Sequence, residues 1–540
     1  MIEHLSLYQA LKQAAYGVED HTAIYYFNSR ISFFKLLKRI DELASVLQNQ
    51  YLIKKGDVVL VSLPNIPETI VLFYALNKIG AISNMVHPNS PFEVMQKYYD
   101  DANCKLAFLF QDRVYRELES YLNFKGTIVL CSAGYSLNIK EREKYNLMNH
   151  KMIKDLKNTR KFLFYSQLDS NNLLSTEVPT REDDVAVLLH SASTTGISKT
   201  ICIGSKSFNF TASRVPEIMC LDKDELKGNS LISVLPSFHG FGLCMTMHAP
   251  LVNSFGVVLI PKFSAKNVVK MMKKVKNAIC ICGVPNVFKA LLNEPSFVNS
   301  RYLKTLKSCF SGGDSLPPLL KEKFDTMLVH RGSNCRLFEG YGLTEALSVC
   351  SVNTHYHHKR GSIGYPINGV SFKILDDNRK ECAPHEVGEI AIKSDNNMLY
   401  YFNDEKATRD TYFGDYLTTG DLGYIDDDGF IYFMTRKKRV IKVSGVAIFP
   451  HEIESVVLGL SGISQVCVVQ IPDEKSGHAA KVYVVSKNKD PERILQICRK
   501  KLISWSIPKE IEFVSSLPMT KFNKVDYRKV QEMENKKRGI

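Results

Sequence analysis

Residues 55–86 carry the pattern that most constrains the fold of this chain: a turn and buried strand at 55–63, a helix at 67–79 and another strand at 80–86. Both strand segments contain short apolar runs, which are typical of buried strands. Two adjacent parallel strands need a connection of roughly a dozen residues or more, which a helix usually supplies. The succession therefore predicts parallel β-α-β units whose helices cover a sheet.

The same alternation recurs along most of the chain. At 31–47 apolar residues recur at helical spacing, and Ser32 can cap the first turn of the expected helix. In the central block we expect strands at 229–236, 257–261 and 278–284, and helices at 264–276 and 285–293. Residues 132–180 interrupt the pattern, because polar and basic residues dominate there. We expect either a surface excursion or an irregular region of strands and loops in that segment.

Smaller units follow towards the C-terminus. Short strands separated by Gly and Asp turns at 361–432 predict a β subdomain. After a charged connector at 435–439, a small α+β unit is predicted, with helices at 450–458 and 491–501 and strands at 466–470 and 480–485. The predicted fold class is therefore α/β. A large N-terminal domain of mixed and parallel sheets flanked by helices, with the β subdomain, spans residues 1–437, and a small mobile C-terminal α+β domain spans residues 438–540.

Composition excludes several classes of protein. The net charge of +14 is spread over 540 residues apart from a few basic runs, so we expect no nucleic-acid partner. The N-terminus lacks the layout of a signal peptide, and no apolar run is long enough for a transmembrane segment. The 13 cysteines are an odd number without zinc-ligand spacing, which favours reduced thiols in a cytoplasmic protein. The sequence does not define an oligomeric state.

One polar loop is a candidate phosphate site. The apolar run 185–189 predicts a buried strand, and residues 191–200 leave it as Ser-Ala-Ser-Thr-Thr-Gly-Ile-Ser-Lys-Thr. Such a loop offers backbone N–H groups and hydroxyls to phosphate oxygens, and Lys199 adds a positive charge. It is not a Walker loop, because serine rather than glycine precedes the lysine. Taken alone, the stretch is equally consistent with a surface loop rich in Ser and Thr.

Further motifs follow the loop in a fixed order. They are Pro-Ser-Phe-His at 236–239, Ser-Gly-Gly-Asp at 311–314, Glu-Gly-Tyr-Gly-Leu-Thr-Glu at 339–345, Gly-Ser-Ile-Gly-Tyr-Pro at 361–366, Gly-Glu-Ile at 388–390, Tyr-Leu-Thr-Thr-Gly-Asp at 416–421, Lys-Val-Ser-Gly at 442–445 and Leu-Pro-Met-Thr-Lys-Phe-Asn-Lys at 517–524. Each motif alone is weak, but the set in register is specific. Over nearly its whole length the chain resembles the adenylate-forming (AMP-binding) superfamily, which includes acyl-CoA synthetases, luciferases and the adenylation domains of peptide synthetases.

The resemblance implies a two-step reaction with ATP, Mg²⁺ and CoA, or the phosphopantetheine arm of an acyl carrier protein. A carboxylic acid attacks the α-phosphorus of ATP, pyrophosphate leaves, and a pantetheine thiol then takes the acyl group. Because both reactants of the first step are anions, they must be neutralised and held in line. Lys524 resembles the lysine that reaches the acyl carboxylate and the α-phosphate. Glu345, together with Thr194, would bind the magnesium ion.

The resemblance also implies the nucleotide site. Asp421 would accept both ribose hydroxyls, because a carboxylate has two acceptor oxygens. Arg436 would meet the ribose or the phosphate, Tyr341 would stack on adenine, and His239 would line the acyl side as a third catalytic residue beside Lys524 and Glu345. The full nucleotide-binding set implied in this way is Ser191, Thr194, Thr195, Gly196, Lys199, Gly312, Gly313, Asp314, Gly340, Tyr341, Gly342, Thr344, Asp421 and Arg436.

For the thioester step, the resemblance implies that the small domain turns about a hinge. Lys438 matches the hinge position, and Lys442 and Gly445 match the segment that meets the pantetheine arm. A hinge residue need only absorb a backbone change, so a lysine at this position is unremarkable.

The chain departs from the family pattern mainly in the phosphate loop. Ser193, Ser198 and Thr200 stand where glycine, proline and glycine are usual. If position 193 needs a left-handed backbone, serine there costs about 1–2 kcal/mol. ATP affinity is the property that such changes touch first. Asn523 replaces the glycine before Lys524, which is mild because asparagine tolerates positive φ.

The leading interpretation is an acid–CoA ligase of fatty acid metabolism or of aromatic acids, because the apolar segment 238–248 would wall the acyl pocket. The first alternative is loading of an acyl carrier protein, which a positive chain would attract. We expect no carrier domain fused to this chain. The second alternative is a non-catalytic nucleotide-binding relative, which the altered loop favours and the retained charged residues oppose. Amino-acid adenylation is disfavoured, because those members usually place an aspartate at the position of His239.

Overall fold

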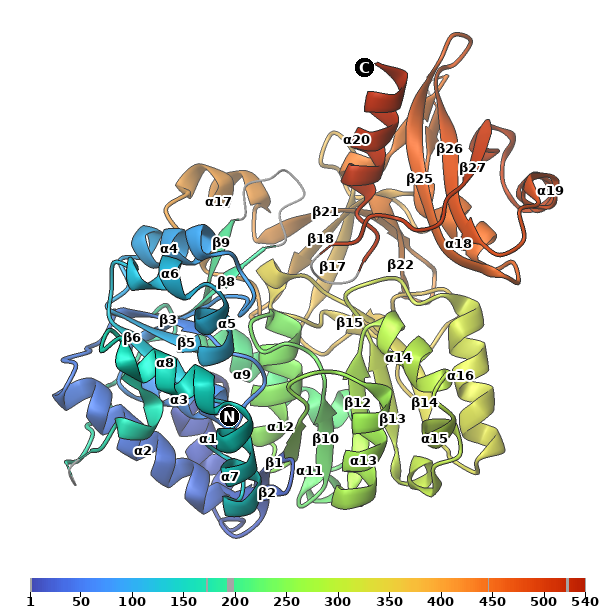
Figure 1. The fold of residues 1–540 in the computed structure, drawn as a ribbon. Coiled ribbons are helices and arrows are strands. Elements are labelled where there is room, and N and C mark those ends of the chain that lie inside the picture. Colours follow the sequence, from blue (N-terminus) through green and yellow to red (C-terminus); the bar gives the residue numbers. More distant parts are fainter. Residues whose placement is uncertain (1, 171–172, 192–198, 445, 521–523, 540) are drawn as a thin grey trace.

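Two large β-sheets form the body of the part of the chain that the structure describes (Figure 1). This computed structural model describes residues 2–170, 173–191, 199–444, 446–520 and 524–539. The first sheet runs in the order β19 (Tyr400–Tyr401), β9 (Thr200–Gly204), β8 (Val185–His190), β4 (Ile82–Met85), β3 (Val58–Ser62), β5 (Leu106–Phe110), β6 (Ile128–Cys131) and β7 (Leu163–Phe164). From β8 to β7 neighbouring strands are parallel, as the pattern at 55–86 predicts.

The second sheet carries the segments that form the candidate site. Its order is β16 (Tyr365–Pro366), β15 (Ser351–Val352), β14 (Arg336–Tyr341), β13 (Ser308–Ser311), β12 (Ala278–Gly283), β10 (Ser230–Ser233), β11 (Gly256–Leu259), β1 (Thr22–Tyr26) and β2 (Ser29–Ser32). The strands β10 to β14 are parallel to their neighbours, whereas β14 and β15 are antiparallel. The predicted α/β fold class is confirmed, as are the expected strands of the central block.

Helices pack on the faces of both sheets (Figure 1). They include α1 (Leu7–Ala15), α2 (Phe33–Asn49), α4 (Phe92–Asp101), α9 (Ser205–Ser213), α13 (Ala265–Val275), α14 (Pro285–Leu292) and α16 (Pro318–His330). The sequence prediction for α2 is confirmed at its start, because the Ser32 hydroxyl accepts a hydrogen bond from the Lys35 N–H at 3.3 Å. This side-chain cap satisfies a backbone donor that the first helical turn leaves without a partner.

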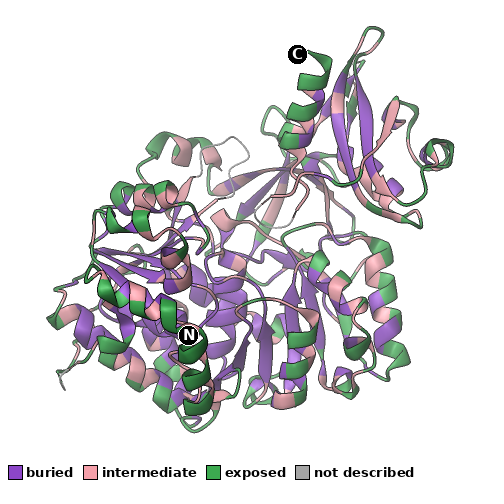
Figure 2. Ribbon diagram, in the orientation of Figure 1, coloured by how far each residue is buried: buried purple, intermediate pink, exposed green. Residues whose placement is uncertain are grey.

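Helix α3 (Pro67–Lys78) is buried along its whole length, and buried residues are purple in Figure 2. Its apolar residues surround the helix instead of forming one stripe, and a helix of that kind has no face for solvent. Two charged residues are nevertheless buried in it. Glu68 pairs with Arg39 at 2.9 Å, and Lys78 pairs with Asp41 at 2.7 Å, so neither charge is left uncompensated.

The expectation for residues 132–180 is wrong over part of that segment. Instead of irregular strands and loops, it contains α7 (Ile139–Met148) and α8 (His150–Asn158). Helix α7 has no buried residue, and α8 buries only Met152 and Leu156. Helix α7 has no apolar stripe and therefore little periodicity to read, and the Asn138 side chain caps its start.

A smaller sheet and a C-terminal unit complete the described chain. The smaller sheet contains β17 (Ser371–Leu375), β18 (Gly388–Lys393), β21 (Tyr416–Ile425), β20 (Tyr412–Phe413) and β22 (Ile431–Arg436), with α17 (Glu405–Thr411) beside it. After η6 (Lys437–Arg439) come β23 (Ile441–Val443), β24 (Val446–Ile448), α18 (Pro450–Leu458), β25 (Ile463–Asp473), β26 (Gly477–Ser486), α19 (Pro491–Lys501), β27 (Glu510–Phe513) and α20 (Tyr527–Arg538). Helices α18 and α19 have the predicted bounds, while the domain boundary at 437/438 stays a prediction.

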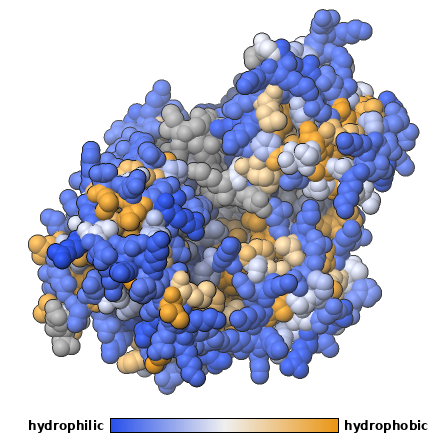
Figure 3. Space-filling model, viewed as in Figure 1, coloured by the Kyte–Doolittle hydropathy of each residue, from blue (hydrophilic) through white to orange (hydrophobic). Residues whose placement is uncertain are grey.

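The face of the molecule shown in Figure 3 is mostly hydrophilic, with separate apolar areas between the hydrophilic ones. Within the described residues, none of the helices combines the length and the apolar character that a bilayer span requires. All 13 cysteines lie in described segments and are free thiols, most of them buried.

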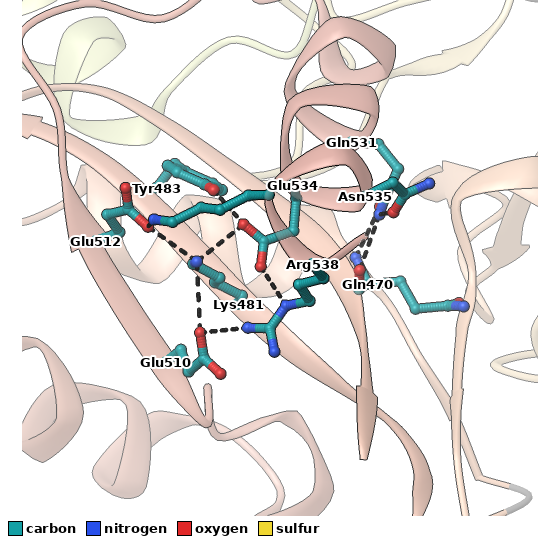
Figure 4. Close-up of polar contacts among 10 residues, drawn as sticks. Gln470, Lys481, Tyr483, Glu510, Glu512, Gln531, Glu534, Asn535 and Arg538 are labelled. Carbon is teal, nitrogen blue, oxygen red and sulfur yellow. Dashed lines mark hydrogen bonds and ion pairs between the residues drawn. The ribbon is translucent and has the colours of Figure 1, made fainter. Parts of the chain in front are cut away.

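A charged cluster stabilises the C-terminal unit (Figure 4). The Lys481 ammonium, on β26, lies 2.9 Å from Glu534, 2.8 Å from Glu512 and 3.4 Å from Glu510. Burial acts to raise the pKa of Glu534, but hydrogen bonds from Tyr483 and Lys481 outweigh it and lower that pKa to about 2. The cluster joins α20 to β26 and β27, which are far apart in the sequence.

Replacing Lys481 with methionine is expected to destabilise the C-terminal unit by about 3 kcal/mol, because it removes the buried cation shared by Glu534 and Glu512 and leaves Glu534 paired with Arg538 alone among the described residues. Trp505 is the only tryptophan of the chain and lies in this unit, so its fluorescence reports local unfolding in urea. The matched control is Lys537→Met, which removes an exposed partner of Glu512 and should cost less than about 1 kcal/mol. Equal effects of both variants would contradict the importance of the buried pair.

Candidate active site

The ends of parallel strands gather the predicted motifs at one edge of the second sheet. Strands β10, β13 and β14 run in the same direction, so the segments that follow them leave from the same edge. These segments hold His239 after β10, the Gly312–Gly313 pair after β13 and Gly342 after β14. In open α/β sheets this edge is where ligands bind.

Close packing leaves little room for a side chain at two of these positions. A Cβ atom on Gly312 would lie 3.1 Å from the Phe241 ring and 3.3 Å from the Gly340 carbonyl oxygen. A Cβ atom on Gly342 would fall on the carbonyl oxygen of Ser348. The backbone segments can therefore approach each other, and a flat ligand, more closely than side chains would allow.

Asp421 is a buried carboxylate, one of whose oxygens accepts no hydrogen bond from a described residue. It lies on β21, is 1% exposed, and accepts a hydrogen bond from the Tyr341 hydroxyl at 2.7 Å through Oδ2. Arg436, its partner across the β21–β22 ladder, brings Nε to 2.8 Å from Oδ1, yet Oδ1 has no hydrogen bond within the described residues. Burial raises the pKa of Asp421 and Arg436 opposes it. An under-satisfied buried acceptor fits a ligand hydroxyl.

Lys524 reaches this edge from the C-terminal unit. Its ammonium donates a hydrogen bond to the carbonyl oxygen of Gly313. The backbone of Lys524 is fixed by Thr520, whose N–H donates to the Lys524 carbonyl oxygen at 2.7 Å and whose hydroxyl accepts from the Lys524 N–H at 3.2 Å. The structure therefore brings together a lysine and a glycine motif that lie 211 residues apart in the sequence.

His239 lies near this lysine and is neutral at physiological pH. Burial lowers the pKa of its imidazole to about 4, and the neighbouring His87 and Lys524 act in the same direction. It is followed directly by η3 (Phe241–His248), a π-helix whose residues are almost all buried. π-helical turns are rare and occur often at functional sites. The apolar segment predicted to wall an acyl pocket is thus an almost wholly buried helical element.

The predicted phosphate loop joins β8 to the antiparallel β9. The Ser191 N–H donates to the Lys199 carbonyl oxygen at 3.0 Å, and the Lys199 N–H donates to the Ser191 hydroxyl at 3.1 Å, which closes the base of the loop. Thr194, Thr195 and Gly196, and the departures at 193 and 198, lie outside the described residues.

Thr200, the departure from the usual glycine after the lysine, has a defined place. It begins β9, and its hydroxyl lies 3.1 Å from Nδ1 of His190, whose Nε2 lies 2.7 Å from the Asn84 side-chain oxygen. Burial lowers the pKa of His190 to about 3, so its imidazole is neutral and can donate to Asn84 while it accepts from Thr200. The threonine therefore ties the loop exit to the core.

Glu345 meets the exit of the phosphate loop through a residue that the sequence did not single out. The Tyr401 hydroxyl donates to Oε1 of Glu345 at 3.0 Å, and the Lys199 ammonium lies 4.1 Å from the centre of the Tyr401 ring. The second carboxylate oxygen of Glu345 makes no hydrogen bond within the described residues, and a carboxylate oxygen is a ligand that Mg²⁺ prefers. In the described part of the chain no three His, Cys, Asp or Glu residues form a metal-binding group.

The remaining predicted residues form few side-chain contacts with other described residues. Thr344 and Asp314 lie beside Glu345 and Gly313 respectively, and the Asp314 carboxylate accepts a hydrogen bond from the Ser315 N–H at 3.1 Å. Lys438 and Lys442 are exposed, and neither side chain forms a hydrogen bond or ion pair with another described residue, although the backbone of Lys442 lies opposite Ala447 in the β23–β24 pair. Gly445 lies outside the described residues.

This fold, with a glycine pair, a buried carboxylate and a lysine from the C-terminal unit at one sheet edge, defines the class of adenylate-forming enzymes. Sequence comparison agrees. Residues 11–402 match the family model of AMP-binding enzymes, and residues 452–524 match that of the AMP-binding enzyme C-terminal domain. The chain belongs to the AMP-binding enzyme family, and the resemblance inferred from the motifs is confirmed.

Several relatives align with this chain over most of its length. It is 29% identical to a long-chain-fatty-acid–CoA ligase of Bacillus subtilis, with 99% of this chain and 96% of that protein covered. It is 28% identical to the probable 4-coumarate–CoA ligase 3 of Dictyostelium discoideum, with 91% and 88% covered. Among solved structures, the anthranilate CoA ligase AuaEII in complex with anthranoyl-AMP aligns with a TM-score of 0.83 at 20% identity, with 99% and 98% covered. This structural likeness confirms the fold.

Proposed function

We propose that this enzyme activates a carboxylic acid with ATP and transfers the acyl group to the thiol of CoA. In the first step a carboxylate oxygen bonds to the α-phosphorus as the bond to pyrophosphate breaks. In the second step the thiol sulfur bonds to the acyl carbon, AMP leaves and the thiol proton is released. The observation that carries the proposal is the contact of Lys524 with Gly313, which brings a cation from one unit to the glycine motif of the other.

Different residues would have different roles in the first step. The spare acceptor of Asp421 would bind a ribose hydroxyl, with Tyr341 and Arg436 holding the carboxylate in place. The Lys524 ammonium would leave Gly313 for the α-phosphate and the acid carboxylate, whose mutual repulsion it would reduce. A magnesium ion, held by Glu345 and by Thr194 of the loop, would supply further neutralisation of the phosphates. Neutral His239 would line the acyl side without adding charge.

For the second step we propose that residues 438–540 act as a mobile lid. Lys438 is exposed and free to follow a change in the backbone of η6, which suits a hinge. Turning about it would withdraw Lys524 and present the segment from Lys442 to Gly445 to the pantetheine arm. Each half-reaction would then use its own face of the same small unit.

We propose a fatty or aromatic acid as the substrate. The buried π-helix η3 offers apolar side chains, and within the described residues it contains no Lys or Arg that could pair with a second carboxylate. The named relatives, a long-chain-fatty-acid–CoA ligase and a probable 4-coumarate–CoA ligase, agree with both classes of acid. An apolar pocket discriminates weakly between acids that differ by a methylene, so several chain lengths should react.

Acid-dependent exchange of labelled pyrophosphate into ATP tests the proposal. We expect exchange with fatty or aromatic acids and none with amino acids. Thioester formation is then compared with CoA and with a phosphopantetheinylated carrier protein as acceptors, and CoA is expected to be preferred. Preference for the carrier would establish the alternative acceptor. Tight ATP binding without exchange for any acid would instead identify a non-catalytic nucleotide-binding relative.

A further inference from the structure

Tyr401 contacts two charged groups of opposite sign that do not contact each other in the described structure. Its hydroxyl donates to the Glu345 carboxylate at 3.0 Å, and the face of its ring lies 4.1 Å from the Lys199 ammonium. Although both groups touch the same side chain, Lys199 and Glu345 form no ion pair in the described structure. The ring attracts the cation through its negative face, so it can hold Lys199 without neutralising it by an anion.

The backbone around Tyr401 is fixed on both sides of this contact. Strand β19 pairs with β9, with Tyr401 opposite Ile201, and the Phe402 N–H donates to the Thr200 carbonyl oxygen at 2.8 Å. Just before the strand, the Met398 N–H donates to the Glu345 carbonyl oxygen at 2.6 Å. Residues 398–402 therefore connect the exit of the phosphate loop to the segment that carries Glu345. Tyr401 itself is 5% exposed, which restricts its side chain to this position.

We propose that Tyr401 is a positioning residue for the metal–nucleotide complex. Its hydroxyl occupies one oxygen of Glu345 and orients the carboxylate so that the other oxygen is available to Mg²⁺. Its ring holds the Lys199 ammonium near the phosphate loop and prevents it from pairing with Glu345. Groups that orient a metal ligand contribute strongly to metal affinity, although they never touch the ion. The inference rests on the proposed adenylation reaction, but its main test is a binding measurement.

Two substitutions separate the roles of the hydroxyl and the ring. Tyr401→Phe keeps the ring over Lys199 and removes the hydrogen bond to Glu345. Tyr401→Leu removes both. The matched control is Tyr412→Phe, because the Tyr412 hydroxyl makes a partly buried hydrogen bond of the same length in the same region, to the Met398 carbonyl oxygen at 3.0 Å, without bonding Glu345.

The experiment measures binding of Mn²⁺, as a probe for Mg²⁺, to the full chain in the presence of a non-hydrolysable ATP analogue, by electron paramagnetic resonance of the free ion. We expect Tyr401→Phe to raise the dissociation constant for Mn²⁺ about 10-fold or more, the range found when a group that orients a metal ligand is removed. Metal-free binding of the analogue should stay unchanged in Tyr401→Phe and weaken in Tyr401→Leu. Tyr412→Phe should resemble the wild type in both assays.

A double-mutant comparison guards against a merely structural effect. If the hydroxyl acts through Glu345, Tyr401→Phe should have no further effect on Mn²⁺ binding in a Glu345→Gln background. An equal loss in both backgrounds, or unchanged Mn²⁺ affinity in Tyr401→Phe, would overturn the inference even if the wild type catalyses exchange. Absence of exchange in the wild type with normal Mn²⁺-dependent nucleotide binding would overturn the proposed reaction instead. The two failures are therefore distinguishable.

Discussion

Replacing Lys524 with alanine is expected to reduce acid-dependent exchange of pyrophosphate into ATP by about 10³-fold, because removing one donor aimed at developing charge typically costs about 10²–10³ in rate. In the structure this ammonium already lies at the edge of the proposed nucleotide site, where it donates a hydrogen bond to the Gly313 carbonyl oxygen. The variant removes the only group contributed to that carbonyl by the C-terminal unit among the described residues. The loss should fall on kcat, with a smaller change in KM for ATP, since Asp421 and the loop remain.

The second half-reaction supplies the decisive control. Thioester formation from a preformed acyl-adenylate should be nearly unaffected by Lys524→Ala, because the proposed lid movement withdraws this lysine before the thiol attacks. Lys529→Ala, which removes an exposed lysine of α20, should leave both half-reactions unchanged. Equal losses in the two half-reactions would mean that Lys524 supports the fold or serves both steps, and the assignment to adenylation would be wrong.

Much of the fold could be predicted from the sequence where burial determines the pattern. The strand, helix and strand predicted at 55–86 correspond to β3, α3 and β4. These elements are largely buried, so their sequences are rich in apolar residues, and that pattern could be read from the sequence. The segment 132–180 could not be predicted for the opposite reason. Helix α7 has no buried residue and is held by its cap, and hydrophobic periodicity cannot report a helix that buries nothing.

The charged residues of the candidate site could be predicted from the sequence, but the contacts that link them to one another could not. The resemblance pointed to Glu345 and Lys199 separately, but no spacing in the sequence links either of them to Tyr401, which reaches them through the pairing of β19 with β9. Thr200 is a similar case. It reads as a departure that weakens the loop, whereas in the structure its hydroxyl meets the buried, neutral His190. Long-range pairing and buried polar contacts decide these roles, and neither leaves a local pattern.

Replacing Asp421 with asparagine is expected to raise KM for ATP by about 10- to 100-fold, because the change removes a charged hydrogen-bond acceptor worth roughly 1.5–3 kcal/mol. Asparagine keeps the shape of the side chain and can still accept from the Tyr341 hydroxyl, but it loses the negative charge that faces Arg436. The control is Asp415→Asn, which removes an exposed carboxylate paired with Lys393 at 2.7 Å, just before β21. It should change KM for ATP little, since an exposed pair contributes little energy.

Nucleotides without ribose hydroxyls show whether the binding energy lost in Asp421→Asn comes from contacts with the ribose. The wild type should prefer ATP to 2′,3′-dideoxy-ATP, because the deoxy analogue leaves the buried Oδ1 of Asp421 without a donor. In Asp421→Asn this preference should largely disappear, as the acceptor that reads the hydroxyls is altered. If the variant still discriminates between the two nucleotides as well as the wild type does, Asp421 does not bind the ribose. Its contacts with Tyr341 and Arg436 would then serve only to join β14, β21 and β22.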